Sequence, residues 1–191
     1  MGRFRLVVGL GNPGNQYQDN RHNVGFKLID MLADKLKQHL VMESKFFGEM
    51  VRFRCNGDEI ILLKPMTFMN LSGKSVGSVA NFYKIKPEEI LIIHDELDFT
   101  SGVIKIKQGG SSGGHNGLKD IDRVMPNNYW RLRVGIGHPG DKDKVAGYVL
   151  TNPSRDQQDE LYAVYNKFIN LFDSFEFGDF NQAQKMLHSK E

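Results

Sequence analysis

The chain has little cysteine, little tryptophan and no long apolar run. It contains one cysteine and one tryptophan among 191 residues. A single cysteine excludes an internal disulfide and fits a reducing compartment, so we expect a cytoplasmic protein. No apolar run approaches the roughly 20 residues of a membrane helix. The apolar stretch behind Arg5 is also shorter than the roughly 7–15 residues of a secretory signal core. We therefore expect no membrane partner.

Net charge is also small, at +2 for the whole chain. Its distribution is uneven, because residues 102–144 hold eight basic side chains against four acidic ones, a surplus of four. A local surplus of this kind favours a site for a polyanion, although an ordinary solvated surface also accounts for it.

Apolar runs and helical spacings alternate along the chain. The predicted strands cover residues 4–10, 47–55, 59–64, 90–94, 103–107 and 132–136. The predicted helices cover residues 23–40, 116–124 and 180–187, with two more opened by Ser72 as N-cap and by a capping box at 153–157. This alternation predicts an α/β fold in a single domain over residues 1–191, with a mixed, largely parallel, twisted sheet and helices on both faces.

A G-x-G-x-x-G run follows the first predicted strand, at Gly9, Gly11 and Gly14. In a dinucleotide site this turn runs directly into a helix whose amides hold the pyrophosphate. Here Pro13 removes one amide donor, and the polar residues 15–22 delay the helix. The sequence therefore predicts neither a dinucleotide nor any other cofactor.

A second glycine cluster, residues 109–117, matches G-x-S-x-G twice, with Ser111 or Ser112 as nucleophile. Asp120 or Asp122 followed by His138 has the chain order of a serine hydrolase triad, as does Asp141 or Asp143 followed by His188. However, no apolar strand leads directly into either serine, as a nucleophile elbow requires. A serine esterase remains an alternative.

Polar residues follow several predicted strands. If these strands are parallel neighbours, Asn12, Asn70 and Asp95 converge on one edge of the sheet, and His22 arrives from the adjoining loop. A histidine accepts a proton at neutral pH, an aspartate behind it fixes its tautomer, and asparagine amides hold carbonyl and amide groups. The set favours water-mediated hydrolysis of an activated acyl bond, although turn, cap or solvated roles are open for each residue. The histidine spacing matches no metal motif, so no metal site is expected.

In addition, the chain resembles the bacterial-type peptidyl-tRNA hydrolases. The matching stretches are 9–14 (GLGNPG) with Tyr17, 20–25 (NRHNVG), 64–73 (KPMTFMNLSG), 94–98 (HDELD), 113–119 (GGHNGLK) and 131–140 (RLRVGIGHPG). They occur in the order of the family and span nearly the whole chain. The resemblance implies a monomeric cytoplasmic esterase that cleaves peptidyl-tRNA released early from the ribosome, so the implied partner is tRNA and not DNA.

The resemblance also implies roles for individual residues. His22 would activate water, Asp95 would hold His22, and Asn12 would discriminate blocked from unblocked aminoacyl-tRNA, with the glycines of the first loop bending it toward the substrate. The implied contacts to the tRNA end and the first peptide units are Tyr17, Phe68, Asn70 and Asn116, with Met69 packed nearby. Lys107 and Arg133 match positions for the tRNA 5′ phosphate. Residues 138–152 would form a mobile lid, and 109–114 the opposite wall.

Besides the serine esterase, one further alternative stays open on the sequence. The chain could bind tRNA ends without catalysis, which would give salt-sensitive binding and no turnover.

Overall fold

The computed structural model describes residues 4–177 and 179–189, so the outermost residues of the predicted 1–191 domain lie outside the described part. The chain forms one seven-stranded sheet in the order β2-β3-β4-β1-β5-β7-β6. The strands are β1 Leu6–Gly9, β2 Val41–Glu43, β3 Gly48–Cys55, β4 Asp58–Pro65, β5 Ile90–Glu96, β6 Ile104–Gln108 and β7 Trp130–Gly135. The α-helices are α1 Val24–Lys35, α2 Ser72–Tyr83, α3 Asn116–Asp122, α4 Val145–Val149, α5 Arg155–Phe177 and α6 Phe180–His188.

The four central strands are parallel, and the outer strands are antiparallel. β1 pairs in parallel with β4 and with β5, and β5 pairs in parallel with β7. β2, β3 and β6 are joined by antiparallel pairs. The carboxyl ends of β4, β1 and β5 therefore meet at one edge of the sheet, and the predicted α/β class with a mixed sheet is confirmed.

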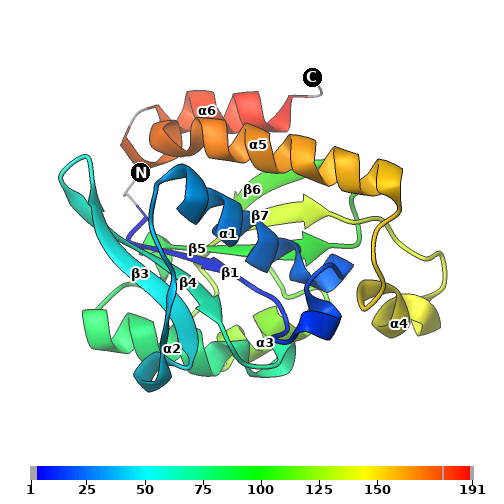
Figure 1. Ribbon diagram of the computed structural model, residues 1–191, viewed down its shortest axis with the longest axis horizontal. Coiled ribbons are helices and arrows are strands. Elements are labelled where there is room, and N and C mark those ends of the chain that lie inside the picture. Colours follow the sequence, from blue (N-terminus) through cyan, green and yellow to red (C-terminus); the bar gives the residue numbers. More distant parts are fainter. Residues whose placement is uncertain (1–3, 178, 190–191) are drawn as a thin grey trace.

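Helices cover both faces of the sheet, with α1, α5 and α6 over one face and α2 and α3 over the other (Figure 1). Alternate residues of β1 divide between the two layers, because side chains along a strand point to opposite faces. Val7 packs in the layer of α1 and α5, whereas Leu6 and Val8 pack in the layer of α2 and α3. Among the described residues, no helix combines the length and the apolar character needed to span a membrane.

The predicted helix boundaries differ most clearly from the structure at α1 and α2, while α3 ends two residues earlier than predicted. α1 ends at Lys35 instead of extending to residue 40, because Lys37 adopts a left-handed conformation with φ 56° and the chain turns into β2. The four-residue spacing of leucines continues past this end to Leu36 and Leu40, and for this reason the predicted helix was too long. Ser72 is the first residue of α2, not its N-cap, and its hydroxyl donates to the Met69 carbonyl at 2.7 Å.

The capping box ahead of α5 is confirmed. The Gln157 amide donates to Ser154 Oγ at 3.2 Å, and the Ser154 amide donates to Gln157 Oε1 at 3.0 Å. This reciprocal pair satisfies two backbone donors that would otherwise lack partners at the start of the helix.

The glycines of the first motif mainly allow close packing. A Cβ at Gly9 would lie 2.1 Å from the Gly25 carbonyl oxygen, and one at Gly11 would lie 2.6 Å from the Phe26 ring. Of the three motif glycines, only Gly14 has a positive φ, at 115°. The expectation that the glycines bend the loop therefore holds for Gly14 alone, while Gly9 and Gly11 let α1 approach β1.

Candidate active site

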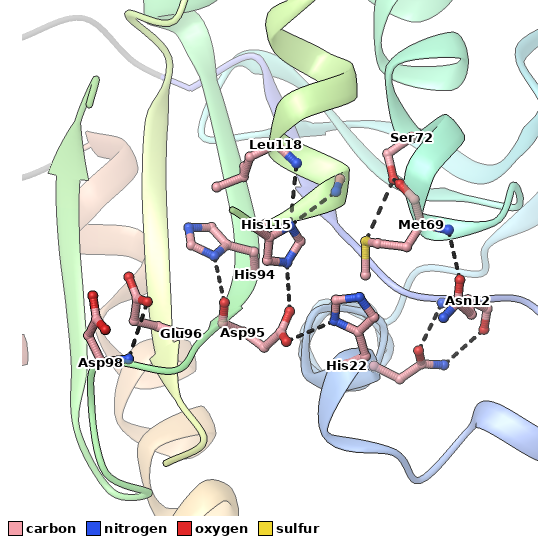
Figure 2. Close-up of polar contacts among 12 residues, drawn as sticks. Asn12, His22, Met69, Ser72, His94, Asp95, Glu96, Asp98, His115 and Leu118 are labelled. Carbon is pink, nitrogen blue, oxygen red and sulfur yellow. Dashed lines mark hydrogen bonds and ion pairs between the residues drawn. The ribbon is translucent and has the colours of Figure 1, made fainter. Parts of the chain in front are cut away.

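Three ionisable side chains meet at the carboxyl edge of the sheet. Asp95 is near the end of β5, His22 lies in the 3₁₀ turn η2 (Arg21–Asn23), and His115 directly precedes α3. His22 Nδ1 lies 2.8 Å from Asp95 Oδ2, and His115 Nε2 lies 2.7 Å from Asp95 Oδ1 (Figure 2). The structure thus joins the predicted pair His22 and Asp95 and adds His115, which the sequence analysis did not assign.

The hydrogen bonds fix which nitrogen of each ring carries a proton. His115 is the N-cap of α3, and its Nδ1 accepts the amides of Gly117 and Leu118 at 3.1 and 3.3 Å. Its proton is therefore on Nε2 and points to Asp95. When His22 donates from Nδ1 to the other carboxylate oxygen, its Nε2 keeps a free lone pair. That lone pair can accept a proton.

Burial and charge act in opposite directions on this cluster. Burial lowers the pKa of His22, but the charge of Asp95 and its hydrogen bond outweigh burial and raise that pKa above its usual value. Burial also opposes ionisation of Asp95, yet the two histidines hold the pKa of this carboxyl well below its usual range. Asp95 therefore stays ionised behind His22.

His94 is the third histidine near the site, and it is only 2% exposed. Its Nδ1 donates to the Asp95 backbone carbonyl at 2.9 Å. Burial, followed by the neighbouring His115, lowers the pKa of His94 to about 3. This ring is therefore neutral at physiological pH and supports the backbone of Asp95.

Asn12 is held in one orientation by its neighbours. Its side-chain Oδ1 accepts the Met69 amide at 2.7 Å. Its backbone amide donates to Asn23 Oδ1 at 2.8 Å, and Asn23 Nδ2 donates back to the Asn12 carbonyl at 2.9 Å. Because Oδ1 is occupied, Nδ2 is the side-chain group that remains available as a donor. The role of Asn23 was not predicted, since a pairing across 11 positions has no local sequence signal.

The remaining predicted contact residues lie in the segments around this cluster. Met69 is buried, and a Cβ at Gly117 would lie 2.7 Å from its sulfur. Met69 therefore packs between the loop of Asn12, to which its amide donates, and the start of α3, which carries Asn116. Phe68 is 57% exposed, and Asn70 and Asn116 are also exposed. Tyr17 is half-buried in the 3₁₀ turn η1 (Asn15–Tyr17), which precedes η2.

The segment predicted as a lid is attached next to His22. The guanidinium of Arg21 lies 4.0 Å from the centre of the Tyr148 ring and donates to Thr151 Oγ1 at 2.6 Å. Tyr148 in turn donates to the Ile136 carbonyl at 2.6 Å. Residues 138–152 are thus in contact with the turn that carries His22.

The two basic residues predicted for phosphate lie on adjacent strands, but in different surroundings. Arg133 forms an ion pair with Glu96 at 2.8 Å. Lys107 stands opposite Arg131 in the β6–β7 register. A Cβ built at Gly110 would lie 2.4 Å from Arg131 Nη2 and 3.0 Å from Lys107 Nζ, so these two cations converge. Arg131 was missed because its partner is set by strand register.

Donor atoms of His22, Asp95 and His115 all lie within 4.8 Å of one another, a spacing that a metal ion could bridge. Asp95 already uses both carboxylate oxygens, and His115 both ring nitrogens, in hydrogen bonds of the cluster. A metal would have to displace those bonds, so the expectation of no metal stays a prediction.

A histidine that can accept a proton from water, beside an amide that can donate to a carbonyl oxygen, is an arrangement typical of hydrolases. The chain belongs to the peptidyl-tRNA hydrolase family, whose model, described as "Peptidyl-tRNA hydrolase", matches residues 6–191. The predicted family is thereby confirmed.

Individual relatives agree with this assignment. The chain is 57% identical to the peptidyl-tRNA hydrolase of Haemophilus influenzae over 169 residues, which cover 87% of each chain. It is 50% identical to that of Delftia acidovorans over 187 residues, covering 97% of this chain and 90% of the other. The crystal structure of the peptidyl-tRNA hydrolase from Acinetobacter baumannii superposes with a TM-score of 0.96 at 43% identity, covering 99% and 96% of the two chains.

Proposed function

We propose that His22 is the general base in the hydrolysis of the ester bond of peptidyl-tRNA. As a member of its family, the protein is an ester hydrolase that acts on peptidyl-tRNA. The observation that carries the proposed role of His22 is its bond from Nδ1 to Asp95, which leaves Nε2 as an acceptor.

The proposed reaction proceeds in two steps. Nε2 of His22 takes a proton from water while the water oxygen attacks the ester carbonyl carbon. Asp95 stabilises the imidazolium that forms, and Asn12 Nδ2 donates to the carbonyl oxygen as it becomes negative. The tetrahedral intermediate then collapses, the bond to the ribose oxygen breaks, and His22 returns its proton to that oxygen. Free peptide and free tRNA leave the site.

We assign binding roles to the surrounding residues. The exposed ring of Phe68 and the half-buried ring of Tyr17 offer aromatic faces, and such faces stack with unpaired bases like those at a tRNA end. The exposed amides of Asn70 and Asn116 flank the cluster and can bind the backbone of the first peptide units. Met69 supports Asn12 by the hydrogen bond from its amide, and it supports the segment of Asn116 by packing against Gly117.

Lys107 and Arg133 are proposed to hold the 5′ phosphate of the tRNA, with Arg131 as an additional cation. Arg131 is only 4% exposed and donates to the Ser111 carbonyl at 2.7 Å, yet no ion pair to it is found among the described residues. A buried cation close to Lys107 and without a carboxylate partner favours an anion there. Phosphate contacts carry no sequence information, which suits a substrate class with many tRNAs.

The same proposal includes a single domain that works as a monomer in the cytoplasm, where drop-off from the ribosome produces the substrate. The serine esterase alternative is not supported. Among the described residues, Ser111 contributes only its backbone carbonyl to a side-chain contact, and no histidine ring bonds to the hydroxyl of Ser111 or Ser112. His115 meets Ser112 only through its backbone amide, which donates to the Ser112 carbonyl at 3.0 Å.

The test compares N-acetyl-aminoacyl-tRNA with unblocked aminoacyl-tRNA as substrates. We expect the wild type to cleave the blocked ester, His22→Ala to lose about 10²- to 10⁴-fold in kcat, and Ser111→Ala/Ser112→Ala to keep full activity. Activity that survives His22→Ala would contradict the proposed base. Intact tRNA binding without cleavage by the wild type would favour the non-catalytic alternative.

A further inference from the structure

A pocket of about 310 Å³ adjoins the site on the side of Asn12. Its wall is formed by the first loop, by α1 and by the end of β4. The lining includes Asn12, Gly14, Gln18, Lys27, Asp30 and Lys64. The volume lies at the lower end of the roughly 300–1,000 Å³ that is typical of ligand pockets, so the pocket is large enough for a short stretch of peptide.

The charges around this pocket are paired with one another. Lys64 Nζ lies 2.9 and 3.1 Å from the two oxygens of Asp30 and 3.5 Å from Glu49. Lys27 Nζ lies 3.1 Å from Asp19. The wall therefore has no unpaired positive charge to attract phosphate, in contrast to Arg131 and Lys107 on the other side of the site.

The pocket also offers uncommitted hydrogen-bonding groups and apolar surface. No side-chain hydrogen bond of Asn15 or Gln18 is found in the described part of the chain, and both are exposed. Phe26 and Met66 add apolar surface to the lining. Free amides beside apolar patches suit a peptide of variable sequence, because the amides can bind its backbone while the patches tolerate different side chains.

We propose that this pocket binds the residues of the nascent peptide that precede the residue esterified to tRNA. The inference rests on the proposed function, in which Asn12 holds the ester carbonyl, and Asn12 is a wall of both sites. The sheet order β4-β1-β5-β7-β6 places the pocket on the β4 and β1 side of Asp95 and the cationic strands β7 and β6 on the opposite side. Figure 2 shows the same order, with Asn12 on one side of His22 and Glu96 on the other. The peptide therefore extends away from the strands that are assigned to the tRNA 5′ phosphate.

The test changes the charge of the pocket and measures charge preference in the peptide. The substrates are N-acetyl-Glu-Phe-tRNA and N-acetyl-Lys-Phe-tRNA, and the readout is the ratio of their kcat/KM values. Asp30→Lys removes the nearer carboxylate partner of Lys64, which keeps only Glu49 at 3.5 Å, and adds a second cation. The Glu-to-Lys ratio therefore rises by about five- to tenfold, with a decrease at higher salt. Gln18→Lys on the facing wall, which breaks no ion pair, raises the ratio in the same direction.

Asp34→Lys is the matched control, because Asp34 is an exposed aspartate on the same helix, one turn away from Asp30 and outside the pocket lining. It leaves the ratio at the wild-type value. A ratio that is the same in Asp30→Lys, Gln18→Lys and Asp34→Lys overturns the peptide site. Failure of the proposed function gives a different result, since the wild type then cleaves neither these substrates nor N-acetyl-Phe-tRNA.

Discussion

His115 Nε2 lies 2.7 Å from Asp95 Oδ1, while Nδ1 of the same ring accepts two backbone amides at the start of α3. One side chain therefore caps a helix and holds the carboxylate that orients His22. The position of α3, which also carries Asn116, is in this way coupled to the geometry of the base.

The two roles of His115 can be separated by substitution. Asparagine is a good N-cap, so His115→Asn keeps the cap but its shorter side chain does not reach Asp95. His115→Ala loses both. Both variants lose the bond to Asp95, so we expect the free energy of unfolding of His115→Ala to lie below that of His115→Asn by about 0.5–2 kcal/mol, the cost of the lost cap, as measured by urea denaturation.

Catalytic activity should depend on the second role of His115, which is its hydrogen bond to Asp95. Both variants lose a hydrogen bond to an ionised group, so kcat falls by about tenfold or more in each. Wild-type kcat in His115→Asn, with loss confined to the less stable His115→Ala, would show that His115 is only a helix cap.

Asp95→Asn tests the coupling between the acid and the base. Burial lowers the pKa of His22, but the charge of Asp95 and its hydrogen bond raise this pKa by more. Neutralising Asp95 therefore lowers the pKa of His22. The base must be unprotonated to act, so the acid limb of the pH profile of kcat/KM moves to lower pH, while the plateau falls by about 10²-fold or more. Asp98→Asn, at a nearby exposed aspartate, keeps the wild-type profile. An unshifted acid limb in Asp95→Asn would assign the titration to another group.

The convergence of Asn12 and Asp95 could be predicted from the sequence, because polar residues that follow parallel strands must meet at one edge of the sheet. The contacts of His115 and Arg131 could not. One depends on where α3 begins relative to β5, and the other on the register of β6 against β7. The end of α1 was misread because leucine spacing records which side chains are buried, and Leu36 and Leu40 remain packed against the core after the helix has ended.

The close contact of β1 with α1 predicts a large effect of one added methyl group. In Gly9→Ala the new Cβ would lie 2.1 Å from the Gly25 carbonyl oxygen, so the backbone must move, at a cost of about 1–3 kcal/mol or more in the free energy of unfolding. Gly147→Ala in α4 is the control, because no atom lies within 4 Å of its added Cβ. Alanine there should be neutral or stabilising by up to about 1 kcal/mol. Equal midpoints of urea denaturation for the two variants would contradict the packing role of Gly9.

The buried ring of His94 predicts a specific dependence of stability on pH. Burial, and then the nearby His115 and Arg131, lower its pKa from 6.5 to about 3. Between these two values the unfolded chain binds a proton that the folded chain does not, so the contribution is complete above pH 6.5 and is lost as the pH falls toward 3. The slope approaches about 1.4 kcal/mol per pH unit.

His94→Asn retains an N–H donor for the Asp95 carbonyl but does not titrate, so its free energy of unfolding falls less steeply between pH 6 and pH 4 than that of the wild type. His22 and Asp95 titrate in both proteins, and their effects cancel when the two slopes are compared. His39→Asn, at an exposed histidine, provides the control and should keep the wild-type slope. If His94→Asn and the wild type lose stability in parallel over this range, His94 is protonated in the folded protein and cannot be the neutral support of Asp95.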